Sequence, residues 1–264
     1  VTALSAGNRA MIKMSEFTPA TNIVIKSMLA GLFSNDKVAV IMGGADVAAH
    51  FSAQPFDHLL FTGSTRVGKM VMAAAAKNLT PVTLELGGKS PTIIDDEINI
   101  KDAVSRFILG KTLNAGQTCV AANRIFVQRS VLETVLEKLT DKVAELKVGN
   151  GLDDGVDIGP LIYPKAKEKV QTLVQDAVDK GASLIGDNSE LEGSFQAPLI
   201  LTDVTPEMDI YHDEVFGPVV SIIAFDDEQE VLQLANDVPY GLAAYFYSEN
   251  ISVRFLLEHV YAAS

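Results

Sequence analysis

The sequence predicts an α/β fold with mainly parallel sheets. Short apolar runs, typical of buried strands, alternate along the chain with segments whose apolar residues recur at helical spacing. Strands that alternate with helices favour βαβ units, in which helices pack against parallel strands. Hydrophobic residues make up 48% of the 264 residues, which is enough for a sizeable core. We expect two domains, residues 1–87 and 88–264, with the flexible pair Gly87-Gly88 at the boundary.

The expected elements follow in order. Strands are expected over residues 10–14, 38–41, 59–62, 82–86, 92–94, 125–127, 219–225 and 243–247. Helices are expected over residues 20–32, 65–77, 100–109, 131–146, 166–180, 228–236 and 251–260. Ser130, followed three residues later by Glu133, indicates a capping box, and Gly181 indicates a helix stop. Both ends of the sequence interrupt helical patterns, so we expect a piece of a longer chain.

Charge and composition exclude several classes of partner. Lys plus Arg is 21 against 34 for Asp plus Glu, a formal charge of −13, which argues against nucleic acid and anionic membranes as partners. A single cysteine allows no disulfide framework and fits a cytoplasmic protein. We recognise no signal-peptide pattern in this sequence and no apolar run long enough to span a bilayer, so neither a signal peptide nor a membrane span is expected within it. His50, His58, His212 and His259 have no ligand spacing, so no catalytic metal is expected.

Cys119 is the only cysteine, and it ends the small and polar stretch Asn114-Ala-Gly-Gln-Thr-Cys119. Two interpretations are open. Cys119 could be a buried, inert cysteine, as free cysteines often are. Alternatively, it could be a catalytic nucleophile, because covalent catalysis requires at least a thiol and a nearby base. The candidate base is Glu85, in the glycine-rich turn Glu85-Leu-Gly-Gly-Lys-Ser-Pro91.

A candidate phosphate site lies in Phe61-Thr-Gly63-Ser64-Thr-Arg-Val-Gly68. The G-x-G-x-x-G fingerprint of dinucleotide sites is absent. However, an apolar strand ends here, glycine and serine turn the chain, and a helix begins at Thr65. Free N–H groups at such a helix start bind phosphate. The alternative is an ordinary strand-turn-helix with Ser64 as the helix cap.

Taken together and in order, these motifs resemble those of the aldehyde dehydrogenase superfamily. They are Phe-Thr-Gly-Ser-x-x-x-Gly, Glu-Leu-Gly-Gly-Lys-Ser-Pro, Asn-x-Gly-Gln-x-Cys and Glu214-Val-Phe216-Gly-Pro218-Val, preceded by Lys13-Met-Ser-Glu16. Met14 departs from the usual Lys-Pro-Ser-Glu. The resemblance covers essentially the whole chain. The segments Met-Ser-Glu-Phe-Thr-Pro and His-Val-Tyr are most similar to those of the bacterial coniferyl aldehyde dehydrogenases. It implies a partial Rossmann-type cofactor domain and an α/β catalytic domain truncated at its C-terminal end.

The resemblance also implies a mechanism. Cys119 would attack the aldehyde carbonyl to form a thiohemiacetal, hydride transfer would leave a thioester, and Glu85 would activate the hydrolytic water. The N–H of Cys119 would be one oxyanion donor. The second donor, an asparagine in the family, belongs to an upstream segment that this chain lacks. A related enzyme that transfers the acyl group to coenzyme A is disfavoured, because such members lack a glutamate at the position of Glu85.

The implied cofactor is NAD in preference to NADP. Gly63 and Ser64 would hold the pyrophosphate, Lys13 and Glu16 the adenosine ribose, and Glu214 the nicotinamide ribose with Phe216 packed nearby; Ser15, Gly68 and Leu86 complete the implied site. Glu16 could instead stabilise a nearby helix N-terminus through the helix dipole. The implied partner is a small-molecule aldehyde, and intact members of the family are usually homo-oligomers. The competing hypothesis is a non-catalytic remnant with a structural or binding role, which the reactivity of Cys119 would distinguish.

Overall fold

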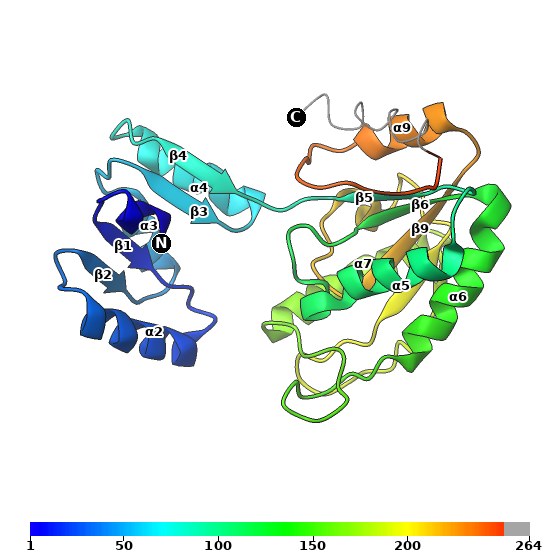
Figure 1. The fold of residues 1–264 in the computed structure, drawn as a ribbon, viewed down its shortest axis with the longest axis horizontal. Coiled ribbons are helices and arrows are strands. Elements are labelled where there is room, and N and C mark those ends of the chain that lie inside the picture. The colour runs from blue at the N-terminus through cyan, green and yellow to red at the C-terminus, as the bar shows by residue number, and fades with distance from the viewer. Residues whose placement is uncertain (251–264) are drawn as a thin grey trace. The chain divides into compact units, whose positions relative to one another are not determined.

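The computed structural model describes residues 1–250; the helix expected over 251–260 lies outside the described residues. The chain divides into two compact units (Figure 1), the first from Val1 to Leu86 and the second from Gly87 onward. No helix within the described part of the chain is long and apolar enough to cross a membrane.

The first unit contains two pairs of parallel strands, and in each pair a helix connects one strand to the next. Strands β1 (Ala10–Lys13) and β2 (Val38–Ile41) pair in parallel and are joined by α2 (Pro19–Leu32). Strands β3 (Leu59–Thr62) and β4 (Val82–Glu85) do the same through α4 (Thr65–Ala76). The short helices α1 (Thr2–Ser5) and α3 (Ala45–Ser52) complete the unit. These are two βαβ units, as the alternation of apolar runs and helical periodicities predicts.

The second unit is built on a six-stranded sheet in the order β10-β5-β6-β9-β8-β7. The strands are β5 (Pro91–Ile94), β6 (Arg124–Gln128), β7 (Ser183–Ile185), β8 (Leu199–Thr202), β9 (Val219–Phe225) and β10 (Tyr245–Tyr247). All neighbours are parallel except β7, which runs antiparallel to β8 at one edge. The central strands β5, β6 and β9 are buried along almost their whole length because a parallel sheet is covered on both faces.

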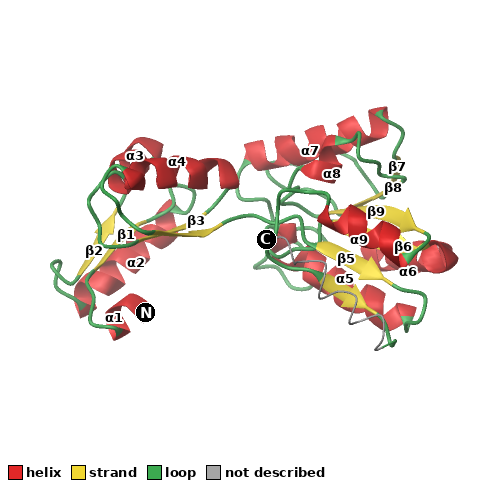
Figure 2. Cartoon of the chain, turned by 90° about the horizontal axis from the view of Figure 1, so that it is seen from above, coloured by secondary structure: helices red, strands yellow, loops and turns green. Residues whose placement is uncertain are grey.

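Helices cover both faces of this sheet. The helices are α5 (Ile100–Thr112), α6 (Leu132–Glu145), α7 (Pro164–Asp179), α8 (Asp209–His212) and α9 (Glu228–Asn236). Alternate residues of each strand separate into two cores, so Phe126 faces α7 and α8 while Ile125 and Val127 face α5 and α6. Figure 2 shows α7 and α8 on one side of the sheet and α5 on the other.

The α/β class is confirmed, and all eight expected strands are confirmed within two residues at each end. Six of the seven expected helices are confirmed, five of them within two residues; the sixth, α5, continues to Thr112, three residues beyond its expected end. The predicted capping box is wrong. A 3₁₀ turn over Arg129–Val131 precedes α6, Val131 is its cap residue, and Ser130 Oγ donates instead to Asp96 Oδ2 at 3.2 Å. The helix stop at Gly181 is confirmed by its φ of +104°. Helices α1, α3 and α8 and strands β7 and β8 were not predicted, because all are short and carry weak periodicity.

Candidate functional site

The candidate residues of the second unit gather at one edge of its sheet, where the parallel strands begin. Gly88 lies just before β5, Asn123 just before β6, Glu214 five residues before β9 and Leu242 just before β10. The buried amide of Asn123 joins these segments. Its Oδ1 accepts from Lys89 Nζ at 3.3 Å and from the Val215 N–H at 3.2 Å. The site is therefore built from loops that precede the strands, whereas open α/β sheets commonly use the opposite edge.

Cys119 lies in the turn that leads into β6, and its side chain is partly buried. A Cβ added at Gly88 would lie 3.0 Å from the Cys119 carbonyl oxygen, so the two backbones approach closely. Within the described part of the chain the Cys119 N–H donates no hydrogen bond. The next residue is anchored, because Tyr245 Oη donates to the Val120 carbonyl at 2.7 Å. The turn thus holds a thiol beside an unused backbone donor.

Two strained turns support this geometry. Asn114, Ala115 and Gly116 all have positive φ, at +51°, +55° and +73°, and Phe216 has a φ of +52°. Left-handed backbone costs on the order of 1–3 kcal/mol at each residue with a side chain, and such strain concentrates at functional sites. The turns contact each other through Gly116, where a Cβ would overlap the Gly217 carbonyl oxygen. Glycine is therefore required at position 116 to bring the loop of Cys119 against the loop of Glu214.

Glu214 is held at the same edge. Its Oε1 accepts from the Gly88 N–H at 3.2 Å, and a Cβ at Gly87 would overlap its Oε2. Lys169 Nζ donates to the backbone carbonyl of Glu214 at 2.6 Å. Burial raises the pKa of the Glu214 carboxyl, while the Gly88 N–H and the lysines at positions 169, 89 and 111 act in the opposite direction. Position and ionisation of this carboxylate are thus set by neighbours on several segments.

Three basic side chains are completely or almost completely buried beside this edge. Lys89 donates to the Ile210 and Asp213 carbonyls at 2.7 and 2.6 Å, and Arg124 donates to the Leu234 and Ala235 carbonyls, each at 2.7 Å. The Arg124 guanidinium also lies over the ring of Tyr211, with Cζ 5.2 Å from its centroid. The third, Lys111, is fully buried in the last turn of α5.

Sequence reasoning assigned no role to several of these residues, which are Lys89, Lys111, Asn123, Lys169 and Tyr245. One of them carried a signal. In α5 the buried positions Val104, Phe107 and Ile108 continue to Lys111, so the lysine occupies the apolar stripe of an amphipathic helix. The others show no such pattern, because their contacts join segments far apart in the sequence.

In the first unit, Gly63 and Ser64 form the turn between β3 and α4. Ser64 is the helix cap, and its Oγ accepts from the Val67 N–H at 3.4 Å, as the alternative interpretation of this segment expected. The N–H groups of the first helical turn have no carbonyl partner within the helix, so the cap and a phosphate seat are compatible. Gly68 is buried against the side chain of Leu86. Glu85 is the last residue of β4, and its side chain is exposed.

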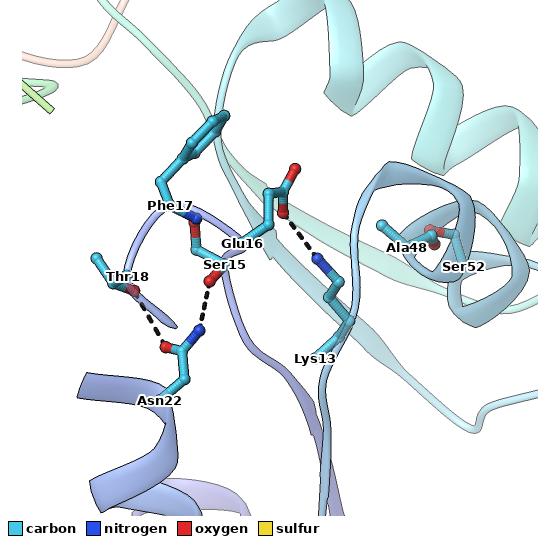
Figure 3. A network of polar contacts seen from close by, with 8 residues as sticks. All are labelled: Lys13, Ser15, Glu16, Phe17, Thr18, Asn22, Ala48 and Ser52. Carbon is cyan, nitrogen blue, oxygen red and sulfur yellow. Dashed lines mark hydrogen bonds and ion pairs between the residues drawn. The ribbon is translucent and has the colours of Figure 1, made fainter. Parts of the chain in front are cut away.

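Lys13 and Glu16 form an ion pair after β1, with Lys13 Nζ 2.9 Å from Glu16 Oε2 (Figure 3). The Lys13 ammonium holds the pKa of the Glu16 carboxyl below its usual range. Figure 3 also shows Asn22 of α2 bonded to the Ser15 carbonyl at 2.5 Å and to Thr18 Oγ1 at 3.0 Å. The turn between β1 and α2 is therefore fixed, and it presents an ionised carboxylate.

The site residues fall into two sets. The first unit brings together Lys13, Ser15 and Glu16 in one turn, and Gly63, Ser64, Gly68, Glu85 and Leu86 around β3, α4 and β4. The second unit contains Cys119, Glu214 and Phe216. Carboxylates and a helix N-terminus suit the hydroxyls and phosphates of a dinucleotide, so these donors and acceptors fit such a cofactor. Among residues 1–250 no group of three or more His, Cys, Asp or Glu side chains is arranged to hold a metal ion.

Comparison with known proteins identifies one family. The family model described as "Aldehyde dehydrogenase family" matches residues 1–258. A probable coniferyl aldehyde dehydrogenase of Pseudomonas aeruginosa is 43% identical over 93% of this chain and 51% of its own length. The chain thus spans about half the length of the curated relatives it matches.

Solved structures agree with this match. A crystal structure described as an Escherichia coli NADP dependent enzyme is 38% identical with a TM-score of 0.93, and the match covers 98% of this chain and 55% of that one. Betaine aldehyde dehydrogenase from Staphylococcus aureus in complex with NAD⁺ is 34% identical with a TM-score of 0.92, and the match covers 97% and 53%. Structures described with either cofactor therefore share this fold.

Proposed function

Because the chain belongs to the aldehyde dehydrogenase family, we propose that its protein oxidises an aldehyde to a carboxylic acid with a nicotinamide dinucleotide. In this proposal residues 1–87 bind the cofactor and residues 88–264 carry the nucleophile. The observation that carries the proposal is the setting of Cys119, a partly buried thiol beside an unused backbone N–H, three residues after a strained turn that contacts the loop of Glu214.

Cys119 is the proposed nucleophile. Its Sγ forms a bond to the aldehyde carbon, and the carbonyl oxygen becomes the oxygen of a thiohemiacetal. The Cys119 N–H, which has no partner in the described part of the chain, is available to stabilise the developing negative charge. The anchor from Tyr245 to the Val120 carbonyl supports this role, because it restrains the peptide that follows the nucleophile.

The bound cofactor supplies the acceptor for the hydride that leaves the thiohemiacetal, and a thioester to Cys119 remains. Glu85 is the proposed base for the water that hydrolyses the thioester. Its carboxylate is exposed at the end of β4, where it can exchange protons with solvent. Hydrolysis breaks the bond between the acyl carbon and Sγ, which regenerates the thiol and releases the carboxylic acid.

The proposed cofactor is NAD in preference to NADP. Glu214 and Glu16 are the proposed acceptors for hydroxyls of the two riboses, and the first turn of α4 with Gly63 and Ser64 is the proposed seat for the pyrophosphate. The ion pair with Lys13 supports the assignment of Glu16, because it keeps the carboxylate ionised. An ionised carboxylate accepts from ribose hydroxyls and repels a 2′-phosphate.

The proposed substrate class is aromatic aldehydes, of which coniferyl aldehyde is the first to test. The similarity to the probable coniferyl aldehyde dehydrogenase of Pseudomonas aeruginosa supports this choice.

The test is NADH formation and acyl-enzyme capture with NAD and coniferyl aldehyde. We expect wild-type protein to form NADH, and we expect the acyl group to map to Cys119 by mass spectrometry of rapidly quenched samples. Cys119→Ala should form neither product, whereas Glu85→Gln should accumulate the adduct because deacylation is slowed. The proposal concerns the intact protein, since the second oxyanion donor is expected upstream of these 264 residues. Folded, intact wild-type protein that forms neither NADH nor an adduct would contradict the proposal and would favour a non-catalytic role.

A further inference from the structure

Lys111 is an exception among the buried basic residues of the second unit. It lies in the last turn of α5 with no exposed surface, and its Nζ has no hydrogen-bond partner among the described residues. An ammonium group has three donors, and burying it without acceptors costs more than burying a neutral polar group. Buried polar groups left without partners are rare and often mark a functional role.

Its two buried neighbours are structural by comparison. Lys89 has three acceptors, which include the carbonyls of Ile210 and Asp213, and Arg124 joins β6 to two carbonyls at the end of α9. These bonds fix loops and helices to the sheet. Among the described residues the Lys111 amine makes no hydrogen bond that would join α5 to another segment, so its role is not explained by such a link.

The charge that Lys111 meets is Glu214. The end of α5 contacts the loop of Glu214, because Gly116 packs against the Gly217 carbonyl and also lies close to the Lys111 carbonyl. Lys111 and Glu214 attract each other electrostatically, and each favours the ionised form of the other. The Gly88 N–H donates to one carboxylate oxygen of Glu214 at 3.2 Å, and the buried Lys111 ammonium acts on the same carboxylate through its charge.

We propose that Lys111 is a positioning residue, whose buried ammonium keeps the Glu214 carboxylate ionised as an acceptor for the ribose hydroxyls of the cofactor. This inference rests on the proposed role of Glu214 in cofactor binding. An ionised acceptor makes stronger hydrogen bonds to hydroxyls than a protonated one. Loss of the Lys111 charge therefore weakens cofactor binding without any direct contact between Lys111 and the cofactor.

The arrangement has a pH dependence. Burial lowers the pKa of Lys111 to about 7, so its charge is lost as the pH rises through neutrality. Lys169 and Lys89 also favour the ionised form of Glu214. Arg124 and Asp213 act electrostatically on Lys89, and Glu214 acts on the hydroxyl of Tyr240. We expect cofactor affinity to fall above about pH 7, by an amount that depends on Lys111.

The decisive measurement is the titration of the Glu214 carboxyl in the 264-residue chain. Glutamate is labelled with ¹³C at the carboxyl, and the Glu214 resonance is identified by its loss in Glu214→Gln. In Lys111→Met the titration midpoint should move to higher pH than in wild type. Lys101→Met is the matched control, because it makes the same substitution at an exposed position of the same helix and should leave the midpoint unchanged. An unchanged midpoint in folded Lys111→Met would overturn the inference.

If Lys111→Met does not fold, the reciprocal titration replaces it. Lysine is labelled with ¹³C at Cε, and the Lys111 resonance is assigned through its backbone. Removing the opposing charge by Glu214→Gln should lower the Lys111 midpoint. Because Glu214 is only partly buried, this variant is expected to fold. A midpoint that does not move would overturn the coupling.

Cofactor binding completes the test. By isothermal titration calorimetry at pH 6.5, Lys111→Met should raise the Kd for NAD relative to wild type, whereas Lys101→Met should leave it unchanged. In the Glu214→Gln background it should add nothing. If Glu214→Gln weakens binding and Lys111→Met does not, the positioning role is overturned. If Glu214→Gln leaves the Kd for NAD unchanged, or if wild type does not bind NAD, the proposed role of Glu214 in cofactor binding is wrong. In that case the carboxyl titration alone tests whether Lys111 keeps Glu214 ionised.

Discussion

Replacing Lys111 by methionine should stabilise the second unit in a pH-dependent way. The folded-state pKa of Lys111 is about 7, against 10.5 for an unperturbed lysine, and burial is the main cause. Between these values the unfolded chain binds more protons than the folded chain, so wild-type stability rises with pH. The slope is about 1.36 kcal/mol per pH unit. Because the folded-state amine is still half protonated at pH 7, the wild-type free energy of unfolding should rise relative to Lys111→Met by about 2 kcal/mol from pH 7 to pH 9.

The assay is urea unfolding followed by far-ultraviolet circular dichroism, at half-unit pH steps for both proteins. Subtracting the two curves removes the groups that titrate identically in both. Below pH 7 the cost of the buried charge is fully present, so Lys111→Met should be the more stable protein there. Lys101→Met should give a flat difference, because that side chain is exposed. A flat difference for Lys111→Met between pH 7 and pH 9 would refute a buried, proton-releasing amine at this position.

Three further predictions concern the site. Gly116→Ala should destabilise the second unit by about 2–4 kcal/mol in urea unfolding, because a left-handed alanine is strained and its Cβ overlaps the Gly217 carbonyl. Gly110→Ala is the control, because a Cβ there meets nothing, and it should stabilise the unit by about 0.5–1 kcal/mol. Equal effects of the two substitutions would contradict the close approach of Gly116 to Gly217. Glu85→Gln should slow steady-state turnover yet keep a pre-steady-state burst of about one NADH per site; loss of both would assign Glu85 to thiol activation. Glu16→Gln should lower the ratio of kcat/KM for NAD to that for NADP, and an unchanged ratio would remove Glu16 from the cofactor site.

Local patterns carried most of the secondary structure. Apolar runs and helical periodicity located β1 to β6, β9, β10 and the long helices, because burial of one face of an element produces an apolar pattern within that element's own sequence. The same reasoning missed β8, although Leu199, Ile200 and Leu201 are fully buried. A four-residue apolar run between loops is too short to distinguish from other buried segments. The sequence around Ser130 matches a capping box, but no capping box forms, because the Ser130 hydroxyl donates to the Asp96 carboxylate instead.

For the site, the sequence by itself determined which residues can carry the chemistry. A single thiol, a glutamate in a glycine-rich turn and a glycine-serine turn before a helix are all readable from residue type and spacing. Only the tertiary structure decided that Gly88, Cys119 and Glu214 meet where the strands begin, and that Lys111 is buried there with no acceptor among residues 1–250. The physical reason is that residue type and short spacing act through neighbouring residues, whereas these contacts join segments separated by up to 126 positions and depend on the register of a sheet formed by the whole unit.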